Sequence, residues 1–254
     1  MASKTRQRPF PPHEVVAVLM ERVPGRFSDK LGLALESHRP KALFLWFLAS
    51  ILYGARISGR IAARTYAEFV RRGLLTPQQI LKTGWEGLVE ALDAGGYARY
   101  DFKTATKLLE VVRTLVDQYH GDLNELHRAA QDARDLENRL KALGKGVGEV
   151  TVQVFLRELR GIWSKADSPL SSLAMLAALD LGLLDKEVGE AGRSEVERMK
   201  ALWQRAGVRG KTFSDFESAL VRLGRDYCRR HRWQSCPMRE FCGGRRASAL
   251  PAKG

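Results

Sequence analysis

The chain lacks several features that would define its class. Its longest apolar run, Ala42 to Tyr53, covers only about half of a membrane span. Lys4, Arg6 and Arg8 are followed by prolines instead of an apolar stretch, so no secretory signal peptide is visible. No strand pattern persists, and there is no internal repeat or low-complexity tract. These absences speak against membrane, repeat and secreted classes, and we expect a soluble cytoplasmic protein.

Cysteine is scarce, and its placement is informative. The only three cysteines are Cys228, Cys236 and Cys242, all in one short segment near the end of the 254-residue sequence. A disulfide framework would need cysteines distributed over the fold. Three cysteines so close together instead favour a local metal site.

Negative charge is also in short supply. The sequence has 42 Lys and Arg against 29 Asp and Glu, which gives a formal net charge of +13. Such an excess favours a polyanionic partner whose binding weakens as salt rises, although it also fits a basic, solvated surface. Nucleic acid is therefore the first partner to consider.

Helical periodicity dominates what is present. Lys41 to Tyr53 is almost entirely apolar and predicts a buried helix. Ser58 to Arg72 is amphipathic and basic, and Thr76-Pro77 is an N-cap followed by proline in the first turn of a helix. Ser168-Pro169 is predicted to cap a helix that runs through Leu181. The chain is long enough for a sizeable core, so we expect an all-α protein of one large domain or two packed ones.

The most informative segment is the glycine hairpin, Gly144-Lys145-Gly146-Val147-Gly148, set between two helical patterns. Glycine disfavours a helix interior but permits positive φ and close approach of the backbone. The segment therefore predicts a helix, a tight turn and a second helix. Successive backbone N–H groups beside a helix N-terminus suit one phosphate.

Gly146-Val147-Gly148 resembles the helix-hairpin-helix of the endonuclease III and MutY superfamily of base-excision DNA glycosylases, with Lys145 where proline is usual. The resemblance extends over roughly residues 41–242. It implies an all-α, two-lobed fold with a C-terminal cysteine loop, acting as a monomer on double-stranded DNA that contains a lesion or mismatch, at the nucleoid and not at a membrane. The further matching segments, in family order, are Phe47–Leu52 followed by Arg64, Gly84–Leu88 through Gly121, and Leu223-Gly224-Arg225 before Cys228.

On this resemblance the chain divides into five parts. DNA would cross the groove between the two lobes, with Lys145, Gly146, Val147 and Gly148 on the phosphates. The expected parts are a basic arm at 1–12, a lobe combining 13–60 with 166–227, a central lobe at 61–165 that holds the hairpin region 137–160, the cysteine loop at 228–242 and a basic tail at 243–254.

The resemblance also assigns the chemistry. Bifunctional members carry a lysine nucleophile two residues after Gly-Val-Gly, where this chain has Val150. An apolar side chain cannot attack the sugar, and neither Lys145 nor Lys165 falls on the motif position. This leaves base removal by water, with the family's aspartate carried over to Asp167. Asp167 has a second reading, as a cap of the next helix, and strand cleavage through another lysine stays an alternative.

The family's cysteine ligands correspond to Cys228, Cys236 and Cys242, while Trp233 stands at the second ligand position. Iron–sulfur clusters normally take four thiolates. The resemblance therefore implies either a 4Fe–4S cluster with three cysteine ligands and His231 as a candidate fourth, or a decayed site whose cysteines are small buried residues.

The same resemblance implies that two loops contact DNA. The loop 53–58 would fill the gap left by a flipped base, with Arg56 or Tyr53 in place of the usual glutamine, although Tyr53 also fits core packing. The cysteine loop would present basic side chains, namely Arg229, Arg230, Arg232 and Arg239.

The function expected is a monofunctional DNA glycosylase that flips and removes a damaged or mismatched base. An alternative is a catalytically inactive DNA-binding protein with the same fold, which Val150, the missing cysteine and the altered loop at 53–58 favour. A basic RNA-binding module ranks last, because no aromatic stacking motif is present.

Overall fold

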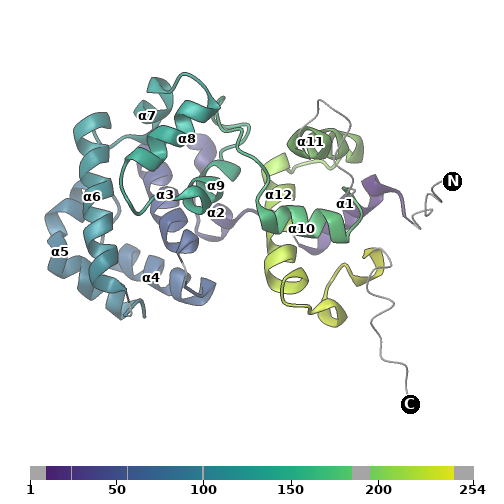
Figure 1. Cartoon of the computed structure of the whole chain (residues 1–254), viewed down its shortest axis with the longest axis horizontal. Coiled ribbons are helices and arrows are strands. Elements are labelled where there is room, and N and C mark those ends of the chain that lie inside the picture. Colours follow the sequence, from purple (N-terminus) through teal and green to yellow (C-terminus); the bar gives the residue numbers. More distant parts are fainter. Residues whose placement is uncertain (1–9, 24, 56, 99, 185–194, 243–254) are drawn as a thin grey trace, which may run out of the picture. The chain divides into compact units, whose positions relative to one another are not determined.

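The computed structural model describes residues 10–23, 25–55, 57–98, 100–184 and 195–242 (Figure 1). Most of these residues are helical, and the described part contains no strand beyond an isolated bridge between Arg160 and Trp163. The all-α prediction is therefore confirmed. Of the helices in these ranges, none combines the length and the apolar character needed to cross a membrane.

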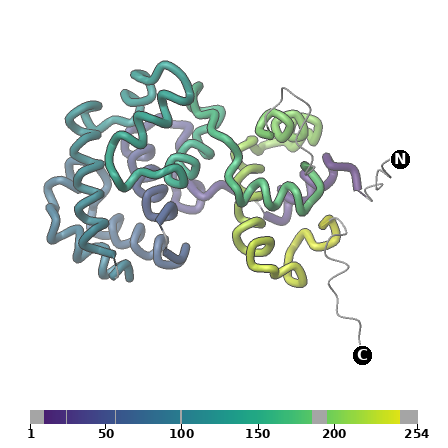
Figure 2. Tube along the Cα trace, viewed as in Figure 1, coloured from purple at the N-terminus to yellow at the C-terminus, as the bar shows by residue number. Residues whose placement is uncertain are grey.

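The chain forms two compact units, one made of Met1–Phe27 with Pro169–Gly254 and the other of Ser28–Ser168. Figure 2 follows the trace through both. The second unit contains α3 (Pro40–Gly54), α4 (Gly59–Arg71), α5 (Pro77–Ala94), α6 (Asp101–Tyr119), α7 (Leu123–Ala129), α8 (Ala133–Ala142) and α9 (Glu149–Arg157), and the first contains α1 (Pro12–Arg22), α10 (Ser172–Asp180), α11 (Glu195–Ala206) and α12 (Phe213–Leu223); the short α2 (Phe27–Lys30) spans the boundary.

The core of the second unit is built around α3, as its apolar sequence predicts. Every residue from Leu43 to Leu52 is buried, and the helix packs on α4 and α9. The Trp46 indole donates a hydrogen bond of 3.0 Å to the Phe155 carbonyl oxygen of α9, so its polar atom is satisfied in the core. Phe47 and Phe155 meet edge to face with ring centroids 5.2 Å apart. These contacts fix α9 against α3.

The expected boundary at residue 60 differs from this division. The sequence predicts residues 28–60 in the lobe containing 166–227, whereas Ser28–Ser168 forms one unit. The reason is packing, because α3 buries its apolar surface against α4 and α9 of the same unit. Arg56 and the arm and tail at 1–9 and 243–254 lie outside the described residues.

In the first unit, α10 packs on α12 and on the π-helical turn Gly224–Cys228. A Cβ on Gly224 would lie 2.1 Å from the Leu173 carbonyl oxygen, so only glycine permits this approach. The helix begins at Ser172 with Ser171 as its N-cap, because the Ser171 hydroxyl accepts from the Ala174 N–H. The predicted cap at Ser168-Pro169 is therefore wrong.

His127, on α7, occupies an apolar site in the second unit. Its ring stacks on Trp163, with centroids 4.6 Å apart and planes inclined by 9°. Its Nε2 is buried and has no hydrogen-bond partner. Burial, followed by the positive charges of Lys165, His38 and Arg128, lowers the pKa of His127 below its ordinary value. The folded protein therefore favours the neutral imidazole.

We expect this histidine to make the protein sensitive to acid. The unfolded chain binds the proton more readily, so the stabilisation is present above the ordinary histidine pKa of about 6.5 and is lost as the pH falls through the lower pKa of the folded state. Urea unfolding of the wild type and His127→Phe near neutral pH and near pH 5 measures this. The difference between the two pH values should be smaller in the variant, and an equal difference would contradict the assignment.

Candidate functional site

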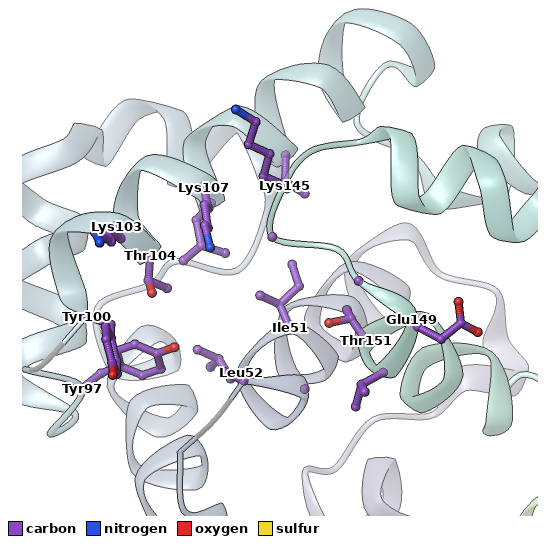
Figure 3. A pocket seen from close by; sticks show the side chains of 17 residues that line it. Ile51, Leu52, Tyr97, Tyr100, Lys103, Thr104, Lys107, Lys145, Glu149 and Thr151 are labelled. Carbon is purple, nitrogen blue, oxygen red and sulfur yellow. The ribbon is translucent and has the colours of Figure 1, made fainter. Parts of the chain in front are cut away.

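A cavity of about 380 Å³ lies in the second unit, among the C-terminal end of α3, the helix α6 and the glycine hairpin (Figure 3). Its volume is within the usual range of ligand pockets. Tyr97 and Tyr100 line it near the start of α6. Apolar side chains and lysines complete the lining, among them Ile51, Leu52, Leu108, Val111, Lys103, Lys107 and Lys145.

The cavity carries uncompensated positive charge. Lys103, Lys107 and Lys145 are exposed, and no carboxylate pairs with any of them in the described ranges. Glu149 is the only acidic residue among the lining residues that the structure describes, and it forms an ion pair with Lys141. That contact raises the pKa of Lys141 and occupies the Glu149 carboxylate. The three lysines are thus left available for an anion.

The glycine hairpin links α8 to α9, in the helix–turn–helix order that the sequence predicts. Gly144 is required by packing, because a Cβ there would lie 2.9 Å from Cγ2 of Val111. Val147 is buried and anchors the turn. Lys145, Gly146 and Gly148 all line the cavity.

Gly146 and Gly148 are glycines that the fold itself does not require. Neither has positive φ. A Cβ on Gly146 would make only ordinary contacts, the nearest at 3.4 Å to Lys107, and one on Gly148 would meet nothing within 4 Å. A backbone left bare toward open space allows another molecule to approach closely. Gly148 also precedes α9 as an N-cap without a side-chain hydrogen bond, so the N–H groups of that first turn can bind an anion.

The C-terminal end of α3 forms the adjoining wall. A Cβ on Gly54 would lie 2.6 Å from Oγ1 and 3.2 Å from Cα of Thr151, so the end of α3 presses directly against the first turn of α9. Gly54 and Thr151 both line the cavity. This close approach fixes the position of the turn that follows the glycine hairpin.

Val150 faces the cavity from that same turn. It lines the cavity and is 56% exposed. The position that the family resemblance assigns to a nucleophilic lysine is therefore on the cavity wall, where this chain presents a hydrocarbon side chain.

Asp167 is held elsewhere in the second unit. Its carboxylate pairs with Nη1 of Arg160 at 3.0 Å, and its side chain is 57% exposed whereas that of Arg160 is only 4% exposed. Arg160 also donates to the Ser168 carbonyl oxygen, so the loop is fixed from both sides. Asp167 is not among the lining residues of the cavity, and it does not cap α10.

Lys165, two residues before Asp167, has a structural role. Its ammonium group donates to the carbonyl oxygens of His127 at 2.8 Å and of Arg128 at 3.5 Å, near the end of α7. A cation there satisfies carbonyl groups that the helix leaves open. This engagement disfavours Lys165 as a substitute nucleophile.

The three cysteines lie in the first unit. Cys228 and Cys236 are buried and Cys242 is half-buried. A hydrogen bond with the Cys236 thiol, followed by burial, raises the pKa of Cys242 well above its ordinary value. The Met238 N–H donates to the Cys236 sulfur at 3.4 Å.

The 4Fe–4S cluster implied by the resemblance stays a prediction. Trp233 occupies the second ligand position, and the described residues contain no group of three or more His, Cys, Asp or Glu side chains arranged to hold a metal ion. His231 is exposed, with its ring edge-on to Trp233 at 5.7 Å between centroids. No step of the function below runs through a cluster.

The remaining candidates fall into two groups. Arg229, Arg230, Arg232 and Arg239 are exposed on the cysteine loop, as expected of residues that contact a polyanion. Tyr53 lies close to Tyr66 of α4, and burial, followed by the effect of Tyr53, raises the pKa of Tyr66 to about 12. This neighbour favours the packing interpretation of Tyr53.

Sequence reasoning missed Lys103, Lys107, Tyr97 and Tyr100. The spacing of the two lysines by four residues places them on one face of α6, which was a usable signal. The cavity they line became visible only in three dimensions. Comparison with known proteins adds nothing to this assignment, because no protein-family model and no curated protein matches the sequence.

The two kinds of glycine predict losses of stability of different size on replacement by alanine. Gly54→Ala should lower the free energy of unfolding by about 1 to 3 kcal/mol, because the added methyl group collides with Thr151. Gly148→Ala should cost no more than about 1 kcal/mol, the price of a poorer N-cap. Urea unfolding of both variants measures this, and a larger loss in Gly148→Ala would show that the fold does need that glycine.

Proposed function

We propose that this chain binds duplex DNA containing a lesion or mismatch and removes the damaged base. The observation that carries the proposal is the open backbone at Gly148, on a cavity lined also by Gly146 and by three lysines without a carboxylate partner. Backbone N–H groups and ammonium groups together suit a phosphodiester, since both bind anionic oxygens. The net charge of +13 adds long-range attraction to a polyanion.

On this proposal, the cavity holds the DNA strand near the lesion. The N–H groups beside Gly148 bind one phosphate, while Lys103, Lys107 and Lys145 bind its neighbours. Tyr97 and Tyr100 offer aromatic surface to sugars and bases. Extrusion of a base costs a few kcal/mol, and the cost is lowest for damaged or mismatched bases, so flipping itself contributes selectivity.

The chemistry rests on Asp167. As the bond between C1′ and the base nitrogen breaks, its electron pair leaves with the base and positive charge develops on the sugar. A carboxylate stabilises that charge, orients the water whose oxygen then bonds to C1′ and accepts one proton of that water, while the departing base nitrogen takes up a proton from solvent. The Arg160 ion pair keeps Asp167 in a fixed, exposed position suited to this role.

The test is a single-turnover assay on oligonucleotides carrying uracil, oxidised pyrimidines, alkylated purines or adenine opposite 8-oxoguanine. Asp167→Asn should reduce base release at least about 100-fold on the preferred lesion while DNA binding is kept. Asp117→Asn, which changes an exposed carboxylate on α6, is the matched control and should retain activity. Unchanged release in Asp167→Asn would remove Asp167 from the mechanism.

A DNA-binding protein without chemistry is the second candidate. The specific observation in its favour is that Asp167 does not line the cavity, and that Val150 stands at the position that the resemblance assigns to a nucleophilic lysine. Binding to abasic DNA with no base released from any lesion would support this candidate over a glycosylase.

The exposed position of Val150 gives a separate prediction. The wild type should yield no covalent adduct with abasic DNA under borohydride, because no amine stands at this position. Val150→Lys places one on the cavity wall, where it can condense with the C1′ aldehyde, release water and be trapped as an amine by hydride. Gln153→Lys, one turn further along α9 and away from the lining residues, is the control. A wild-type adduct would mean that another lysine acts.

A further inference from the structure

The arginines of α4 and of its C-cap, Arg72, fall into two pairs with opposite surroundings. Arg71 and Arg72 both bind the Glu68 carboxylate, at 2.8 and 2.7 Å, and Arg72 also reaches Glu90 at 3.2 Å. Hydrogen bonds from Arg71 and then Arg72 lower the pKa of Glu68 to about 2. The charge at this end of α4 is therefore largely compensated.

Arg60 and Arg64 lie one turn apart in the first half of the same helix. Both are exposed, and within the described ranges neither has a carboxylate partner. Their spacing of four residues puts them on one face of α4. Glu68 stands a further four residues on, but its two carboxylate oxygens accept hydrogen bonds from Arg71 and Arg72. This half of the helix keeps its positive charge.

Two glycines fix Arg64 beside the cavity wall. A Cβ on Gly95 would lie 2.5 Å from Cα of Thr65, so the end of α5 presses directly against α4. Gly96 follows with a φ of +88°, and its Cβ position lies 3.8 Å from Nη1 of Arg64. The guanidinium thus lies next to the turn whose next residue, Tyr97, lines the cavity.

From this arrangement we infer that Arg60 and Arg64 form a second binding site for a phosphodiester backbone, continuous with the cavity that holds the strand. The inference rests on the proposed DNA binding and extends its surface from the glycine hairpin and α6 onto α4. A guanidinium suits this role because its planar fork donates two parallel hydrogen bonds to phosphate. The ligand class is nucleic-acid backbone, read by charge and not by base.

The experiment measures the affinity of the full chain for a duplex with an abasic-site analogue, by fluorescence anisotropy over a range of salt concentrations. Each lost phosphate contact makes the slope of log affinity against log salt shallower by about 0.9. Arg60→Ala and Arg64→Ala should each reduce the slope by about that amount, and the double variant by about twice as much. Arg71→Ala removes the same charge from the same helix and should leave the slope unchanged.

Two further measurements make the outcomes distinct. Urea unfolding shows whether each variant is folded, and Lys107→Ala, on the cavity itself, tests the proposed function independently. Suppose that the wild type binds DNA in a salt-dependent way and that Lys107→Ala makes the slope shallower by about 0.9. If Arg64→Ala then leaves the slope unchanged, as Arg71→Ala does, only the inference about α4 is overturned. If the wild type shows no salt-dependent binding to DNA, the proposed function and the inference both fail.

Discussion

The close approach of α3 to the first turn of α9 is the constraint on which the candidate site depends. Gly54 lies against Thr151, and the Trp46 indole is hydrogen-bonded to Phe155 further along α9. Because α3 is buried almost throughout, it cannot shift without disturbing the whole core of its unit. The position of the glycine hairpin is therefore fixed by the packing of the core. A pre-formed binding surface of this kind avoids the entropy cost of ordering a loop on association.

Helix positions were largely predictable because the signals are local. The apolar stretch Lys41 to Tyr53 corresponds to α3, and Thr76 caps α5 as expected. The start of α10 was not predictable, since Ser168 and Ser171 are both acceptable N-caps by residue type. Tertiary contacts decide which serine caps the helix. Arg160 donates a hydrogen bond to the Ser168 carbonyl oxygen, and Ser171 caps the helix. The unit boundary depended in the same way on which neighbours α3 packs against.

The site was predictable only in part, for a related reason. The glycine hairpin is a contiguous pattern, and its turn can be recognised from sequence. The cavity joins it to residues distant in the chain, namely Tyr97, Lys103 and Lys107, whose proximity follows from packing. The sequence also does not show whether a glycine is required for folding or for binding a ligand. Gly144 and Gly148 look equivalent in the sequence, but only at Gly144 would an added methyl group clash with a neighbouring side chain.

Val150 and Tyr100 give the cavity wall exposed apolar surface among its lysines. On the proposed function, a deoxyribose ring that covers this surface removes it from water. That contribution comes from hydration and not from counterion release, so high salt does not abolish it. Its thermodynamic mark is a negative heat-capacity change of association. Hydrophobic and electrostatic contributions then act at one cavity. Temperature dependence reports the first contribution, and salt dependence reports the second.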